Sequence, residues 1–126
     1  MRRLRSEQGA TAVEFALVVP LLLVLLIGVI EFGRVFNTQL QLTAAARESV
    51  RVMAIQKQPD TARNAALAAA PGLAPALTAA NVQVSPSSCS STTDVTVTIS
   101  YSVSLLSGLF ADAVPLTGQA VMRCGG

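Results

Sequence analysis

An apolar run near the N-terminus constrains the chain more than any other feature of its sequence. The 16 residues from Phe15 to Ile30 carry no charge, and the 21 residues from Ala10 to Ile30 carry only the charge of Glu14. An α-helix rises about 1.5 Å per residue, so a helix over this run would span about 30 Å, the thickness of the hydrocarbon core of a bilayer. We therefore predict a membrane-spanning helix at residues 10–30.

Basic residues flank this run on its N-terminal side. Arg2, Arg3 and Arg5 precede it, and the next basic residue is Arg34. The cytoplasmic flanks of membrane helices are enriched in lysine and arginine, so this asymmetry predicts a cytoplasmic N-terminus. Residues 31–126 would then form one small domain on the other side of the membrane.

Glu14 is the exception within the run, because a carboxylate inside a bilayer costs about 2–3 kcal/mol or more unless a partner neutralises it. A cleavable secretory signal would have a shorter apolar core and a small-x-small cleavage site, which the residues from Glu31 to Arg34 do not offer. A plain signal anchor would leave Glu14 without a role.

Cleavage between Gly9 and Ala10 is the third interpretation, and we favour it. It would make Ala10 the N-terminus and place Glu14 one helical turn from the new ammonium group. A carboxylate suits a helix N-terminus and can neutralise an ammonium group on the same chain or on a neighbouring chain.

The residues around this site carry a family resemblance. A short basic leader, MRRLRSEQG, ends in Gly9, and Glu14-Phe15 follows after four residues at the start of an apolar helix. This arrangement resembles the processing site of type IV pilins. The run from Gly9 to Phe36, followed by LTAAARESVR, resembles the TadE-like family of pseudopilins, minor pilin-like proteins of the tight-adherence (Flp) pilus system. The likeness covers about Gly9–Val52 and extends more loosely to the C-terminus.

The resemblance implies a function and a set of partners. The chain would be a minor pilin or pseudopilin that acts in the assembly of a Tad pilus, with residues 1–9 as a leader that a prepilin peptidase removes. Glu14 and Phe15 would set the register between subunits. Its partners would be the peptidase, other pilins or pseudopilins, the Tad inner-membrane assembly platform and the lipid bilayer. Residues 31–126 would form a pilin-like domain in the periplasm or outside the cell.

A different class of function remains open beside this one. The chain could instead be a single-pass, membrane-anchored binding module with no role in a filament. The mature N-terminus separates the two, because only the pilin-like function needs the cut after Gly9.

The first helix is predicted to continue past the membrane. Apolar residues recur at helical spacing through Phe32, Val35, Phe36, Leu40, Leu42, Ala46, Val50 and Met53. We therefore predict one helix from Ala10 to Ile55, whose stripe suits packing both within the chain and between subunits. Ala12 and Ala16 form a pair of small residues that lets helices approach closely in lipid. Pro20 removes one backbone hydrogen bond, which predicts a kink or local melting.

The pattern after Lys57 predicts a second helix and then a sheet. Helix is expected over Thr61–Ala70 with Asp60 or Thr61 as its N-cap, and one further turn over Pro75–Ala80.

Strict alternation from Asp94 to Val103 predicts a strand, with Val82–Val84 and Leu116–Met122 as its antiparallel neighbours. The expected fold is α+β and pilin-like, with a long helix packed on a small three-stranded antiparallel sheet. The connecting run Leu105–Leu116 is unusually apolar. We predict that it tucks under the sheet, and its alternative place is the membrane surface.

Two cysteines fall at the same end of this predicted sheet. Cys89 lies between the first two strands and Cys124 lies just after the third. A bond between them would close a loop of 35 residues, worth about 4 kcal/mol on the chain-entropy model. Both lie on the oxidising side of the membrane, so we predict a disulfide in preference to two free thiols.

The composition argues against several other functions. The chain has no histidine, so neither a Ser-His nor a Cys-His pair can form, and two cysteines cannot fill a zinc shell. The net charge is only +2, and three of the nine basic residues belong to the leader, where membrane topology explains them. We expect no enzymatic activity, no cofactor or metal ion, and no nucleic-acid partner.

Overall fold

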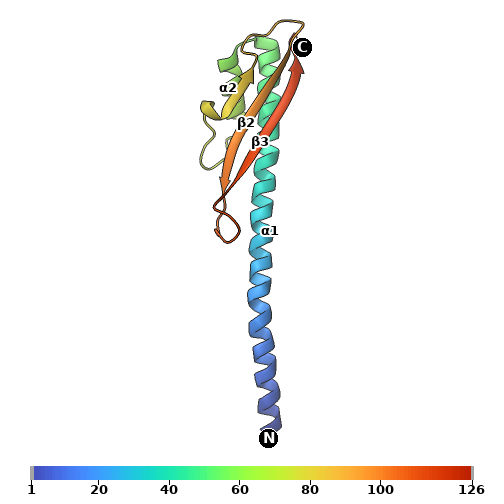
Figure 1. Cartoon of the computed structure of the whole chain (residues 1–126), viewed down its shortest axis with the longest axis vertical. Helices are drawn as coiled ribbons and strands as arrows, with labels where there is room; N and C mark the ends of the chain where they lie inside the picture. Colours follow the sequence, from blue (N-terminus) through green and yellow to red (C-terminus); the bar gives the residue numbers. More distant parts are fainter. Residues whose placement is uncertain (1, 126) are drawn as a thin grey trace. The chain divides into compact units, whose positions relative to one another are not determined.

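The computed structural model describes the backbone of residues 2–125 and the side chains of residues 7–125 (Figure 1). Its elements are α1 (Arg2–Gln56), α2 (Pro59–Ala69), the 3₁₀ turn η1 (Ala79–Asn81), β1 (Val82–Ser85), β2 (Asp94–Ser104) and β3 (Ala113–Arg123). The chain forms two compact units, residues 1–34 and residues 35–126. The predicted α+β fold, a long N-terminal helix with a three-stranded antiparallel sheet, is confirmed.

Helix α1 is longer than the sequence predicted. It begins at Arg2, eight residues before Ala10, and ends at Gln56. The helix runs unbroken through Pro20, so the predicted local melting is wrong; the apolar helix formers on both sides maintain the helix despite the missing donor. At its C-terminus, Lys57 adopts a left-handed conformation with φ of 59°, and its N–H donates to the Met53 carbonyl at 2.9 Å. This is the αL cap, which satisfies one of the last free carbonyls of the helix.

Helix α2 starts two residues earlier than predicted. Its N-cap is Gln58 and Pro59 is its first residue, so neither Asp60 nor Thr61 is the cap. Proline suits this place because its fixed φ is already helical and its missing N–H would have no partner there. Asp60 lies in the first turn and forms an ion pair with Arg63 at 2.8 Å.

The extra turn predicted at Pro75–Ala80 is also placed differently. The structure has a 3₁₀ turn at Ala79–Asn81, where the Asn81 side-chain oxygen accepts the N–H of Thr78 at 3.0 Å. The carbonyl of Pro75 accepts a hydrogen bond from the Tyr101 hydroxyl at 2.7 Å instead of a helical N–H. A contact with a distant strand has therefore replaced the local turn.

The sheet has the predicted strands in the order β1-β2-β3, all antiparallel. β2 and β3 pair along their whole length, from Asp94↔Arg123 to Ser104↔Ala113. The predicted alternation of β2 is confirmed, because its apolar residues are buried while its polar residues lie on the other face; these apolar residues are Val95, Val97, Ile99, Tyr101 and Val103.

The apolar run after β2 does not tuck under the sheet, so that prediction is wrong. β3 begins at Ala113, three residues before the predicted start, and the connection shortens to residues 105–112. Leu106, Leu109 and Phe110 are 72%, 62% and 61% exposed. Because β2 and β3 stay paired up to Ser104↔Ala113, the connection is too short to fold back beneath the strands.

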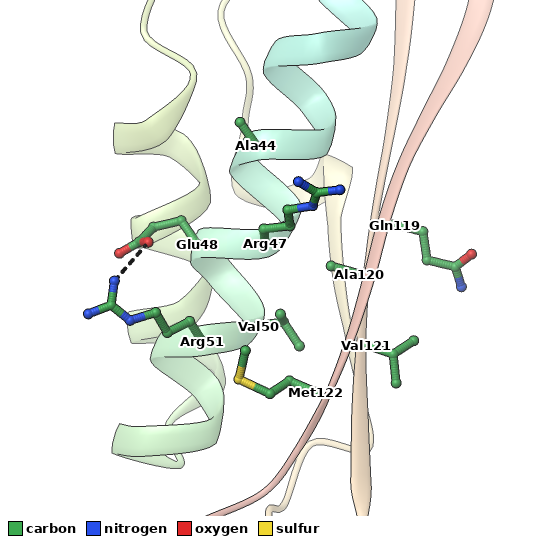
Figure 2. Close-up of a pocket in the computed structure, with 9 residues that line it drawn as sticks. All are labelled: Ala44, Arg47, Glu48, Val50, Arg51, Gln119, Ala120, Val121 and Met122. Carbon is green, nitrogen blue, oxygen red and sulfur yellow. Dashed lines mark ion pairs between the residues drawn. The ribbon is translucent and has the colours of Figure 1, made fainter. Parts of the chain in front are cut away.

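Strand β3 runs alongside α1 in the same direction within the second unit. The Gln39 side-chain amide donates to the Thr117 carbonyl at 2.8 Å, and just past the end of β3 the Gly125 N–H donates to the Ala54 carbonyl of α1 at 3.1 Å. Between these contacts the two elements line a shallow groove (Figure 2).

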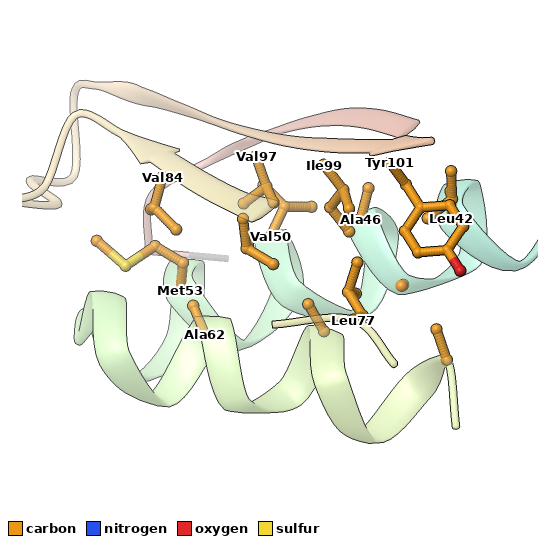
Figure 3. Packing of buried hydrophobic residues seen from close by; sticks show 14 of the residues in the cluster. Leu42, Ala46, Val50, Met53, Ala62, Leu77, Val84, Val97, Ile99 and Tyr101 are labelled. Atoms are coloured by element: carbon orange, nitrogen blue, oxygen red, sulfur yellow. The ribbon is translucent and has the colours of Figure 1, made fainter. Parts of the chain in front are cut away.

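The core of the second unit lies between the sheet and the two helices. Figure 3 shows the apolar side chains of β1 and β2 pointing toward α1 and α2. From α1 the completely or almost completely buried residues are Leu42, Ala45, Ala46, Val50, Met53 and Ala54. The alanines Ala62 and Ala66 of α2 are fully buried and let the two helices approach closely. Ser49 joins the helices, because its hydroxyl donates to the Ala62 carbonyl at 2.7 Å in a fully buried position.

Candidate functional site

The first unit is a helix with an apolar surface. Its exposed large apolar side chains, which lie between Val13 and Phe32, have exposed fractions between 46% and 72%. A helix that is apolar on all sides is stable in lipid or among other helices, but not in water. Its length and composition allow it to cross a membrane, which indicates a single-pass membrane anchor.

The predicted cleavage site lies on this helix, at exposed residues. Gly9 and Ala10 both face outward, and an added β carbon at Gly9 would meet no atom within 4 Å. Glycine destabilises a helix interior by about 1 kcal/mol relative to alanine. Packing within the chain therefore does not require glycine at this position.

Glu14 lies one turn of α1 after Ala10. Side chains of an α-helix lean toward its N-terminus, so the direction of the Cα–Cβ bond at Glu14 favours Ala10. In the uncut chain the nitrogen of Ala10 is a neutral amide, and it would become a cation only after cleavage. Phe15, beside Glu14, is 70% exposed and adds an apolar contact surface next to the carboxylate.

The small residues singled out in the sequence share one face of the helix. Ala12, Ala16 and Pro20 recur every four residues, and all three are exposed. Pro20 has no N–H for the Ala16 carbonyl, which therefore lacks its usual helical donor. Small residues at this spacing are typical of surfaces where helices approach closely in lipid.

An ion pair that the sequence analysis did not identify follows the apolar run. Arg34 lies 3.5 Å from the carboxylate of Glu31, and Glu31 is only 4% exposed. The spacing of three residues was the signal available in the sequence, because side chains at i and i+3 of a helix are neighbours. The pair neutralises the first charges that follow the apolar run.

The two cysteines are joined, as predicted. Cys89 and Cys124 form a disulfide with their α carbons 5.6 Å apart, and Cys124 is 3% exposed. The N–H of Cys124 donates to the Thr93 carbonyl at 2.9 Å. The bond thus fastens the end of β3 to the β1–β2 connection, which gives it a structural role.

The groove between α1 and β3 is the other candidate site in the second unit, with a volume of about 560 Å³. It is lined by Ala44, Arg47, Glu48, Val50, Arg51, Gln119, Ala120, Val121 and Met122. Glu48 and Arg51 form an exposed ion pair at 3.6 Å (Figure 2). The lining offers no serine, threonine or cysteine nucleophile, and the described side chains include no cluster of three or more potential metal ligands. The sequence alone could not pair this part of α1 with β3, because the two lie far apart along the chain.

Comparison with known protein families finds a match to the N-terminal part of the chain. The family model of TadE-like protein matches residues 9–51. This segment is TadE-like. The predicted resemblance is therefore confirmed over that range, which starts at Gly9 and includes Glu14 and the whole apolar run. Comparison with curated proteins and with solved structures found no match.

The TadE-like segment covers most of α1 and none of the sheet. The match covers 43 of the 126 residues of the chain. The segment contains the predicted cleavage site, Glu14 and the face formed by Ala12, Ala16 and Pro20.

Proposed function

We propose that the chain is a minor pilin or pseudopilin that acts in the assembly of a Tad pilus, after a prepilin peptidase cuts between Gly9 and Ala10. The observation that supports this most is the TadE-like match, which begins at Gly9 and continues through the apolar run. The absence of any packing requirement for glycine at this position agrees with recognition by another molecule, the peptidase.

The proposed topology has residues 1–9 in the cytoplasm, residues 10–30 across the inner membrane and residues 31–126 on the periplasmic side. The arginines before the apolar run favour this orientation. The Cys89–Cys124 disulfide agrees with it, because structural disulfides persist in oxidising compartments such as the periplasm.

Cleavage would create the charge that Glu14 lacks in the uncut chain. The ammonium group of Ala10 would neutralise Glu14 of the same subunit or of a neighbouring subunit, and the low dielectric of the lipid would strengthen this attraction. The face formed by Ala12, Ala16 and Pro20 would let neighbouring helices approach to the distance at which the two charges meet. A new subunit would thereby find its register along the helix axis.

Mass spectrometry of protein isolated from its native host tests the proposal. We expect a mature chain that begins at Ala10. Gly9→Val should block the cut but leave membrane insertion intact. The matched control is Gly33→Val, also in α1, because an added β carbon at Gly33 likewise meets no atom within 4 Å. This control should be processed normally.

The result that would overturn the proposal is a full-length chain in a host with an active prepilin peptidase. That result would favour the single-pass anchored binding module, which needs neither the cut nor a pilus. Normal piliation after deletion of the gene for this chain would argue in the same direction.

A further inference from the structure

We propose that the tip of the β2–β3 hairpin, residues 105–112, inserts into the interface of the lipid bilayer that the N-terminal helix crosses. This inference rests on the membrane anchoring proposed above but not on a role in a pilus. It assigns a second membrane contact to the chain, made by the domain that follows the anchor.

The tip presents apolar side chains that the protein does not cover. Leu106, Leu109 and Phe110 are each more than 60% exposed, and the first charged residue in this connection is Asp112 at its base. Three such side chains within five residues form an exposed apolar patch, which in soluble domains marks a contact with another molecule or with a membrane.

The strands hold this tip in a defined place. The Leu105 N–H donates to the Asp112 carbonyl at 3.1 Å, which extends the β2–β3 ladder by one pair beyond Ser104↔Ala113. Gly108 then reverses the chain with a φ of 62°, a conformation that glycine adopts without strain. The apolar side chains therefore project from a paired hairpin and not from a free loop.

Because β3 runs in the same direction as α1, the hairpin tip before β3 lies at the same end of the second unit as Val35, its first residue. Thr117 contacts Gln39, and the two elements run in the same direction. Going back four residues covers about 13 Å of strand, to Ala113, but only about 6 Å of helix, to Val35. The hairpin tip therefore extends beyond Val35.

The chain itself keeps this end of the unit close to the bilayer. Val35 follows Ile30, the end of the proposed membrane-spanning segment, by five positions, and five residues can span at most about 17 Å. The headgroup region adds about 5–8 Å of interface on each side of the hydrocarbon core. A tip that extends past Val35 can therefore reach lipid headgroups.

The chemistry of the tip indicates which lipids it prefers. Leucine and phenylalanine bury favourably at the boundary between headgroups and acyl chains. Residues 105–111 contain no lysine or arginine, so attraction to anionic lipid does not contribute. Insertion should therefore be equal in neutral and anionic membranes.

Tryptophan fluorescence tests this in the full chain, because the sequence contains no tryptophan. Phe110→Trp, reconstituted in phosphatidylcholine vesicles, should show blue-shifted emission and at least a twofold loss of intensity with brominated lipids. Bromines near the headgroups should quench it more than bromines deep in the acyl chains. Adding anionic lipid should change neither result.

Two matched variants make the outcome decisive. Val121→Trp places the probe on β3 at a similarly exposed residue away from the tip and should be little quenched. Leu22→Trp places the probe in the apolar run, where deep bromines should quench it most, and so reports the anchor separately.

An unquenched Phe110→Trp beside a quenched Leu22→Trp would overturn the hairpin contact alone. A blue shift without quenching would also overturn it, since the tip would then be buried against protein. An unquenched Leu22→Trp would overturn the anchor and this inference together.

Discussion

Gly118 of β3 lies directly against the backbone of Leu42 in α1. A β carbon on Gly118 would be 2.5 Å from the carbonyl oxygen of Leu42 and 2.6 Å from its carbonyl carbon, so no side chain fits there. Leu42 is itself completely buried. This close approach sets the distance between the strand and the helix, and so determines how the sheet closes over the core.

We predict that Gly118→Ala destabilises the second unit, because either β3 or α1 must move to admit the methyl group. The free energy of unfolding should fall by about 1–3 kcal/mol, the usual effect of overpacking a core. Denaturant unfolding of the full chain in detergent micelles, followed by near-ultraviolet circular dichroism, measures this change.

Gly72→Ala is the matched control for Gly118→Ala. A β carbon there would be 3.6 Å from the Gln41 side chain, an ordinary contact, so the free energy of unfolding should change by less than about 0.5 kcal/mol. Equal denaturant midpoints for the two variants would contradict the prediction, because they would show that β3 and α1 move apart without loss of free energy of unfolding.

Glycine at position 118 also shows what a sequence can and cannot predict. A glycine inside an apolar strand pattern is a recognised sign of close backbone approach, but the partner, Leu42, lies 76 residues away and follows only from the tertiary register. The long helix and β2 were predictable because their periodicity is local. The hydrogen bond from Tyr101 to Pro75 was not, since it depends on how two separate segments meet.

The apolar run after β2 shows a different limit. Its composition predicted contact with something apolar. The underside of the sheet was the wrong choice of partner, because pairing of β2 with β3 leaves a connection too short to fold back beneath the strands. The sequence could place Gly9 and Glu14 near one another because they are neighbours on one helix, and the cut after Gly9 stays a prediction. The groove was not, because Arg47 and Gln119 come together only when β3 packs along α1.

We predict that loss of the disulfide destabilises the second unit. Cys89→Ser should lower the free energy of unfolding by about 2–4 kcal/mol, because a closed loop of 35 residues becomes an open chain. Position 89 is preferable to position 124, where a buried hydroxyl would add a second cost. The thermal midpoint and the rate of proteolysis measure the effect.

The double variant Cys89→Ser/Cys124→Ser provides the control for this prediction. A reducing agent should lower the midpoint of the wild-type protein but leave that of the double variant unchanged. Two thiols that react with an alkylating reagent in the folded, oxidised protein would contradict the bond.

We predict an alkaline limit to stability from Tyr101. Burial raises the pKa of its hydroxyl above the ordinary value of 10.0, so the folded chain holds the proton more tightly than the unfolded chain does. The resulting stability is fully present below pH 10 and is lost as the pH rises toward the pKa of the folded state. Ultraviolet absorbance reports the titration directly, because Tyr101 is the only tyrosine.

Tyr101→Phe removes both the titrating proton and the hydrogen bond to Pro75, and each loss has its own measurable effect. It should remove the alkaline dependence of this residue and reduce the free energy of unfolding by about 0.5–1.5 kcal/mol, because the Pro75 carbonyl loses its donor. Titration of Tyr101 in the folded protein at or below the ordinary pKa would contradict the prediction.

We predict that the charge of Glu14 is needed for assembly but not for membrane insertion. Glu14→Gln keeps the shape and hydrogen-bonding capacity of the side chain and removes the charge that the Ala10 ammonium group would meet. Glu14→Leu should insert still more readily, since a carboxylate inside a bilayer costs about 2–3 kcal/mol or more.

Both variants should be cut, accumulate in the membrane at normal levels and support few pili. A pilus-production assay beside a membrane-abundance blot measures both properties. Glu7→Gln is the matched control: its carboxylate lies in the segment that the proposed cut would remove, so piliation should be normal. Normal piliation with Glu14→Gln or Glu14→Leu would show that the charge is dispensable, and the anchored binding module would then be the better account of this chain.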